Sequence, residues 1–150
     1  MKSDPLITYR RKPATLDDES LQSFAEVLRA RVARGREFHC RITNDAELQS
    51  LNARFRGKDE PTDVLSFPSP TEALSESSLG DIAISLQRAR TQARQYRHAA
   101  EDEIRILMLH GLLHLLGMDH ETDSGGMRRT ETRWRRNLGL PAGLTERGAA

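Results

Sequence analysis

Residues 106–120 read ILMLHGLLHLLGMDH, and this stretch carries the most information about the fold. Leucine and methionine residues cover most of the surface of a helix built on it, which predicts a buried helix over residues 100–116. His110 and His114 are four residues apart, so their side chains lie on one face of that helix, one turn apart. Buried histidine side chains need polar partners, and a metal ion can supply them. The stretch therefore predicts a buried helix that carries a metal site.

The spacing of the histidines favours zinc. Two imidazole nitrogen atoms at this spacing can each reach one metal ion at about 2.0–2.1 Å. His120 lies ten residues after His110, about three turns along a straight helix and too far to share the ion. Gly117 can adopt a left-handed conformation that ends the helix and turns the chain back. We therefore expect one zinc ion per chain, held by His110, His114 and His120, with a fourth position open as in catalytic zinc sites.

The same spacing occurs in the metzincin peptidases, whose motif is HExxHxxGxxH. In those enzymes the glutamate after the first histidine is the general base. Gly111 stands at that position here. A peptidase of this type would lack its proton acceptor, so the sequence weighs against peptide hydrolysis.

Strands and helices alternate upstream of this stretch, and helices dominate after it. The hydrophobic periodicity predicts four strands, over residues 6–9, 38–42, 64–67 and 81–84. It predicts helices that begin at the cap Thr15, at Asn44 or Asp45, and then over 87–96, 100–116 and 124–138. The pattern indicates an α+β domain, with a small mixed sheet, at least one parallel strand pair and about five helices packed against it.

Composition is that of one globular domain. The chain has 150 residues, of which 37% are hydrophobic and 30% charged, so we expect a single domain over residues 1–150 with a flexible tail from about 139 to 150. The sequence has neither an apolar stretch of about 20 residues nor the apolar region of a signal peptide. The single cysteine, Cys40, alternates with apolar Phe38 and Ile42, which predicts a buried packing role. One cysteine also suits a reducing compartment, and we expect a cytoplasmic protein with no membrane partner.

Charge is balanced overall but uneven along the chain. A net charge of +1 does not by itself indicate a nucleic-acid-binding protein. One segment is strongly basic, with Glu131 as its only acid; its arginines are Arg128, Arg129, Arg133, Arg135 and Arg136. Such a cluster is either a solvated helix face or a surface that contacts phosphates, and the sequence leaves both open.

The chain resembles the YbeY family, a group of bacterial single-strand-specific endoribonucleases. The resemblance rests on HGLLHLLGMDH at 110–120 and on blocks upstream of it, namely Asn52, Phe55-Arg56, Lys58, TDVLSFP at 62–68 and LGDI at 79–82. It covers most of the chain and implies the family's mixed four-stranded sheet with surrounding helices. It also implies zinc dependence and a role in maturing the 3′ end of small-subunit (16S) rRNA and in ribosome quality control. The partners implied are single-stranded RNA, the ribosome and ribosome-associated proteins.

The resemblance also implies roles for particular residues. The zinc ligands are again His110, His114 and His120, and the functional arginine of the family's cavity falls on Arg56. The planar, permanently charged guanidinium of Arg56 suits a phosphate, and Lys58 is a weaker phosphate-binding candidate.

Acidic residues near these motifs have open roles. Asp119 and Asp63 could each hold a ligand imidazole in place or contact RNA, and Glu121 could do the former. Asp63 could equally cap a turn and Glu121 could face solvent. No residue of the sequence stands out as the general base.

Two other function classes remain open. A zinc hydrolase of another substrate class would share the three histidines, and the missing glutamate weighs against it. A non-catalytic, zinc-stabilised ribosome assembly factor would need a protein side chain in the fourth zinc position, and no cysteine lies near the motif to fill it. Incubation of RNA with the protein, with and without a chelator, separates these classes.

Overall fold

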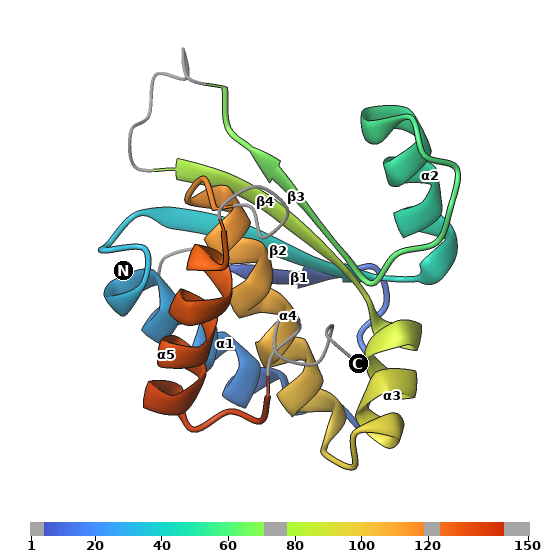
Figure 1. Cartoon of the computed structure of the whole chain (residues 1–150). Coiled ribbons are helices and arrows are strands. Elements are labelled where there is room, and N and C mark those ends of the chain that lie inside the picture. Colours follow the sequence, from blue (N-terminus) through green and yellow to red (C-terminus); the bar gives the residue numbers. More distant parts are fainter. Residues whose placement is uncertain (1–4, 71–77, 119–123, 143–150) are drawn as a thin grey trace.

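The structure, a computed structural model, describes residues 5–70, 78–118 and 124–142 (Figure 1). Its elements follow in the order β1 (Ile7–Tyr9), α1 (Asp18–Arg31), β2 (Glu37–Thr43), α2 (Asp45–Arg56), β3 (Val64–Pro68), β4 (Ser78–Ser85), α3 (Leu86–Gln95), α4 (Ala100–Leu115) and α5 (Gly126–Leu138). This is the α+β organisation that the sequence predicts, with boundaries shifted by one to three residues.

The four strands form one mixed sheet in the order β1-β2-β4-β3. The β1–β2 and β2–β4 pairs are parallel, and β3 runs antiparallel to β4. A helix follows β1 and another follows β2, as parallel pairing requires, because a short turn cannot return the chain to the same end of the sheet. In this order β3 is an edge strand.

Alternation along the strands gives the sheet two different faces. Ile82 on β4 pairs with Ser66 on β3, and both side chains face α4, which packs across this side. The neighbouring pair, Ala83 and Leu65, faces the opposite side, where Leu48 of α2 covers it in a separate small cluster.

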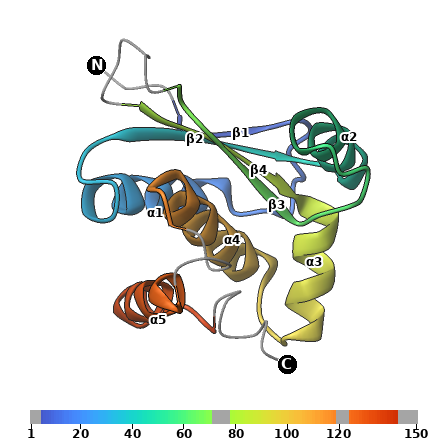
Figure 2. The ribbon, with the colours of Figure 1, turned by 45° about the horizontal axis from the view of Figure 1, so that its top comes forward.

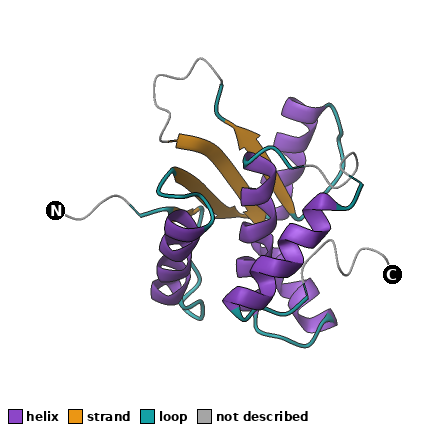
Figure 3. Ribbon diagram, turned by 60° about the vertical axis from the view of Figure 1, so that its left-hand side comes forward, coloured by secondary structure: helices purple, strands orange, loops and turns teal. Residues whose placement is uncertain are grey.

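The helices form layers on the sheet. Figure 2 shows α2 alone on one side, while α1 and α4 lie on the other side and α5 lies beyond α4. Coloured by secondary structure, Figure 3 shows the helices around the sheet from another side. The main core fills the space between the sheet, α1 and α4, and nearly every residue of α4 from Ile104 to Leu113 is buried. The helix with the histidines is therefore the buried helix that the sequence predicts.

Two helix ends matter for the site and for the sequence predictions. Gly117 ends α4 with a φ of +94°, a left-handed conformation that favours glycine, as predicted. Thr15 does not cap α1, contrary to expectation. Asp17 does, and its carboxylate accepts a hydrogen bond from the Ser20 N–H. A carboxylate gains more from the partial positive charge of a helix N-terminus than a hydroxyl does.

The structure also bears on the expectations for Cys40, for the C-terminal tail and for membrane-spanning helices. Cys40 is fully buried, and burial raises the pKa of its thiol to about 12, so its role is packing. Leu140 is also buried, which means that the predicted flexible tail does not include that residue, and residues 143–150 lie outside the described part of the chain. Among the described residues, no helix is long and apolar enough to cross a membrane.

Candidate metal centre

The C-terminal half of α4 brings two imidazole rings together. The Nε2 atoms of His110 and His114 are 3.2 Å apart, and the rings meet edge to face at 70°. Two nitrogen ligands of a tetrahedral zinc ion, each at about 2.0–2.1 Å, are about 3.3–3.4 Å apart. The separation observed in the pair therefore fits two ligands of one zinc ion. We call these two residues the histidine pair.

A third residue fixes the orientation of His110. Glu131 of α5 is buried, and its Oε2 lies 2.7 Å from the Nδ1 atom of His110. A carboxylate accepts hydrogen bonds, so this contact favours the tautomer of His110 with its proton on Nδ1 and a lone pair on Nε2, the atom that faces His114. Metal-binding histidines are commonly held by a carboxylate in this manner. The donor set therefore suits a metal ion.

From the sequence alone, Glu131 has no apparent role beyond opposing the charge of the nearby arginines. A signal for its position was present, because Glu131 follows Met127 by four residues and precedes Leu138 by seven. That is the spacing of the apolar stripe of a helix. A single acid placed on the apolar stripe of an otherwise basic helix indicates a buried partner for that acid.

Gly111, which follows His110 in sequence, lies where α4 packs closely against the sheet. A Cβ atom there would be 2.9 Å from Cγ2 of Ile82 and 3.2 Å from Oγ of Ser66. The Ser66 hydroxyl also donates a hydrogen bond of 2.9 Å to the Gly111 carbonyl. Glycine thus has a packing reason at this position, because any larger side chain would have to displace the side chains of Ile82 and Ser66.

We expect Gly111→Ala to lower the thermal unfolding midpoint. Helix propensity alone favours alanine by about 1 kcal/mol. Overpacking a close-packed contact costs about 1–3 kcal/mol, and here the neighbour is the short, branched side chain of Ile82. The double variant Gly111→Ala/Ile82→Ala should therefore be more stable than the two single effects added together. A higher unfolding midpoint for Gly111→Ala would show that the contact does not constrain the helix.

The other predicted ligand falls outside the described part of the chain. His120 and Asp119 both belong to residues 119–123, for which the structure describes no placement, and so does Glu121. Among residues 5–70, 78–118 and 124–142, no three His, Cys, Asp or Glu side chains are grouped as metal ligands. The histidine pair is the described part of the predicted zinc site.

Arg56 and Lys58 lie at the end of α2, and both are exposed. The ring of Phe55 packs edge to face on Phe67 of β3, with centroids 5.4 Å apart, which ties this end of α2 to the edge strand. Phe67 and Ser66 point to opposite faces of β3, and Ser66 contacts α4. The two cationic residues thus lie around the sheet edge from the helix that carries the histidine pair, and within residues 5–70, 78–118 and 124–142 no hydrogen bond or ion pair joins them to that helix.

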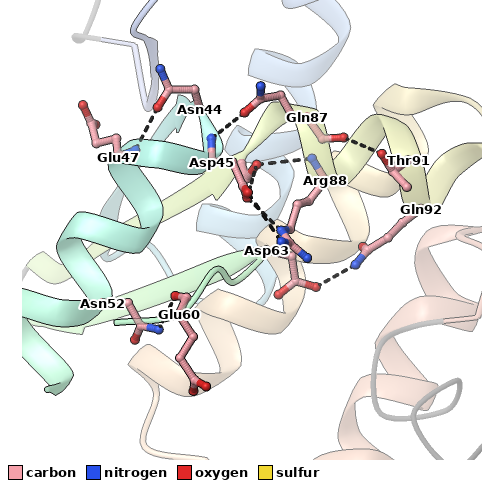
Figure 4. Close-up of polar contacts among 11 residues, drawn as sticks. Asn44, Asp45, Glu47, Asn52, Glu60, Asp63, Gln87, Arg88, Thr91 and Gln92 are labelled. Atoms are coloured by element: carbon pink, nitrogen blue, oxygen red, sulfur yellow. Dashed lines mark hydrogen bonds and ion pairs between the residues drawn. The ribbon is translucent and has the colours of Figure 1, made fainter. Parts of the chain in front are cut away.

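Asp63 directly precedes β3, beside the C-terminal end of β4. Its Oδ2 accepts a hydrogen bond of 3.1 Å from Nε2 of Gln92 on α3, and its carbonyl accepts one from the Ser85 N–H (Figure 4). Asp45 of α2 pairs with Arg88 of α3 close by, at 2.7 Å. Within the described residues, these contacts hold α2, β3 and α3 together and do not reach the histidine pair.

The same junction carries a surface cavity of about 420 Å³, which is lined by Asp45, Gln87, Arg88, Thr91, Gln92 and Gln95. Its one acid and its one base form an ion pair with each other. The remaining lining groups are amides and a hydroxyl, which do not titrate near neutral pH. The cavity therefore offers hydrogen bonding but no free acid or base.

A mixed four-stranded sheet covered by a helix with a histidine pair defines an α+β protein with a candidate metal centre. Similarity to known proteins then identifies the family. The family model described as endoribonuclease YbeY matches residues 7–139, from the first residue of β1 to the residue after α5. The endoribonuclease YbeY of Solibacter usitatus is 57% identical over 141 residues, covering 94% of this chain and 92% of that protein. The endoribonuclease YbeY of Koribacter versatilis is 44% identical over 144 residues, covering 95% and 91%.

A solved structure agrees with these relatives. The solution structure of TM1509 from Thermotoga maritima has a TM-score of 0.56 and 27% sequence identity, and the match covers 87% of this chain and 93% of that one. The chain belongs to the YbeY endoribonuclease family.

Proposed function

We propose that this chain is a zinc-dependent endoribonuclease that cleaves single-stranded RNA. The observation that carries the proposal is the histidine pair, with its Nε2 atoms 3.2 Å apart and the Nδ1 of His110 held by the buried Glu131. His120 would be the third zinc ligand, as its place in the motif suggests. RNA is proposed as the substrate because the relatives are named endoribonucleases.

The physiological role that we propose follows from the same family. The chain would act in the cytoplasm on small-subunit rRNA, in maturation of its 3′ end and in ribosome quality control. Its partners would be the ribosome and ribosome-associated proteins. The balanced net charge of +1 is compatible with a specific rather than an indiscriminate RNA-binding protein.

Different residues of this chain have different roles in the proposed reaction. When bound, zinc supplies Lewis acidity toward water and toward a phosphoryl oxygen. The histidine pair offers its Nε2 lone pairs, and Glu131 keeps the proton of His110 on Nδ1, away from them. Arg56, with an exposed guanidinium at the end of α2, binds the phosphate that is cleaved and offsets its charge. Lys58, also exposed, is a further phosphate-binding candidate and adds a second positive charge near Arg56.

Arg56→Ala should lower kcat/KM for RNA cleavage by about 100-fold or more, because a positioned cationic donor to a reacting oxyanion contributes about that factor. Zinc content and unfolding midpoint should stay at wild-type values, since the side chain is exposed. Arg54→Ala is the matched control, because Arg54 is an exposed arginine in the same last turn of α2. Equal losses in the two variants, or an unfolded Arg56→Ala protein, would contradict the proposed role.

The substrate class is tested by offering one protein preparation three substrates. We expect endonucleolytic cleavage of single-stranded RNA and little cleavage of a stable RNA duplex. A duplex holds its backbone in A-form geometry and does not present splayed bases and phosphates to a small site. Casein should not be hydrolysed, because Gly111 leaves no general base of the zincin type. Preferential casein hydrolysis would assign the site to another hydrolase class.

A further inference from the structure

The outward face of α5 is basic along its whole length. Its buried side presents Met127 and Glu131, and Trp134 and Leu138 pack against the core beside them. The exposed side carries four arginines, which are Arg128, Arg129, Arg133 and Arg136. The helix has 13 residues, so this face is about 20 Å long.

These charges are not neutralised within their own helix. Glu131, its only acid, is buried against His110 and is not available to the outward arginines. Within the described part of the chain, none of Arg128, Arg133 and Arg136 forms an ion pair. Several other arginines of the protein do, each with an acid at 2.6–2.9 Å: Arg29, Arg41, Arg88 and Arg105. On the outward face of α5, Arg128, Arg133 and Arg136 thus present positive charge that no acid within the described residues pairs with.

A residue distant in sequence extends this face. The guanidinium of Arg31, at the end of α1, lies over the Trp134 ring at 5.7 Å and donates a hydrogen bond to Oδ1 of Asn137. Asn137 and Arg133 are four residues apart and so lie on the same side of α5. Arg31 thus joins the arginines of α5. We call Arg31, Arg128, Arg129, Arg133 and Arg136 the α5 basic surface.

Acidic side chains gather at a different place. The first turn of α1 holds Asp18 and Glu19, and the first turn of α4 holds Glu101 and Asp102. The two turns touch, because the Glu101 carboxylate accepts a hydrogen bond of 3.0 Å from the Asp17 N–H. This acidic group lies at the beginning of α1, whereas Arg31 is the last residue of that 14-residue helix, about 20 Å away. Although the net charge is only +1, the acidic turns and the α5 basic surface thus lie at different places, and the basic surface attracts a polyanion locally.

The α5 basic surface is also connected to the histidine pair. Glu131 on the buried side of α5 contacts His110, so the helix that holds one ligand in place carries the cations on its other side. We infer that the α5 basic surface binds the phosphate backbone of single-stranded RNA and holds the strand beside the metal centre. This inference rests on the proposed function for its substrate class. The surface is distinct from Arg56, which lies with α2 on the other side of the sheet (Figure 2).

The test is an equilibrium binding titration of a short labelled single-stranded RNA over a range of salt concentrations, with chelator present to prevent cleavage. Each phosphate contact contributes about −0.7 to the slope of log K against log salt for a single strand. Arg133→Gln/Arg136→Gln should therefore flatten the slope by about 1.4 and weaken binding. Glutamine preserves helix propensity, so the unfolding midpoint should not change.

A matched control removes the same charge elsewhere. Arg90→Gln/Arg94→Gln replaces two arginines on α3, one half-buried and one exposed, and neither is in an ion pair within the described residues. This variant should keep the wild-type slope. Equal flattening in both variants would show a general charge effect, and no flattening in either would make the face a solvated one. Both results would overturn the inference.

A cleavage assay separates this inference from the proposed function. If both hold, Arg133→Gln/Arg136→Gln should raise KM and leave kcat near the wild-type value, because the surface holds the strand and does not touch the reacting atoms. Slope flattening specific to the α5 variant, in a protein that cleaves no RNA, would refute the proposed function and uphold the binding surface. A fall in kcat at unchanged KM would contradict the assigned role.

Discussion

Substitution of His114 by alanine is expected to release most of the zinc from the purified protein and to lower its unfolding midpoint. His114 supplies one of the two Nε2 atoms that converge at 3.2 Å, so its loss leaves the ion with at most two histidine ligands of the motif. Binding energy at a zinc site formed by folding is also folding energy, so the variant should lose the stabilisation that zinc confers. Elemental analysis gives the zinc content, and thermal unfolding with and without added zinc gives the stability.

The matched control for this variant is His39→Ala. His39 is exposed on β2 and lies in another part of the fold, so its removal should leave about one zinc ion per chain. Full zinc occupancy in His114→Ala would sink the assignment of the histidine pair. Equal zinc loss in both variants would show that the metal was bound adventitiously.

Removal of the Glu131 carboxylate is expected to have the second largest effect. Glu131→Ala leaves the buried Nδ1–H of His110 without the acceptor now 2.7 Å away, which costs about 1–3 kcal/mol of stability. Loss of a carboxylate that holds a ligand imidazole also weakens metal affinity by about 10–100-fold. Thermal unfolding of the zinc-free protein measures the first effect, and a competition titration against a chelating dye measures the second.

Glu131→Gln distinguishes the role of the hydrogen bond from that of packing. The glutamine amide has nearly the same shape and keeps a carbonyl oxygen that can accept from Nδ1, but it carries no charge. We expect its zinc affinity to lie between those of the wild type and Glu131→Ala. Wild-type zinc affinity in the alanine variant would mean that the Glu131 side chain only fills space between α5 and α4.

The local features of the centre could be predicted from sequence, because they depend on short-range geometry. The spacing of His110 and His114 fixes them on one helical face, the leucines around them predict burial, and Gly117 predicts the end of α4. The alternation of apolar residues likewise placed the four strands. These predictions use only the periods of a helix and a strand.

The features that sequence reasoning missed depend on contacts between distant segments. Glu131 is 21 residues from His110, and nothing local shows which buried group it meets. The sequence shows only that Gly111 replaces the glutamate base of the metzincin peptidases. The structure adds that Gly111 lies in close contact with Ile82 on β4. Thr15 and Asp17 are both acceptable helix caps by residue type, and the structure shows Asp17 as the cap that is used.

The position of Arg56 in the fold also depends on contacts between distant segments. Its place after Phe55 and before a glycine marks the end of a helix, but the side of the sheet on which that helix lies depends on strand order. The structure places α2 opposite α4, with the edge strand β3 between them. A phosphate bound by both Arg56 and the metal centre would therefore lie at the edge of β3, and this strand would form one border of the site.

The most direct test of the central claim is cleavage of a labelled single-stranded RNA before chelation, after chelation and after zinc is returned. The His114→Ala protein, purified identically, controls for contaminating nucleases. The account predicts that the wild type loses cleavage on chelation and regains it with zinc, and that the variant shows none in any condition. Equal cleavage by the wild type and His114→Ala would contradict the assignment of the histidine pair as the catalytic metal centre.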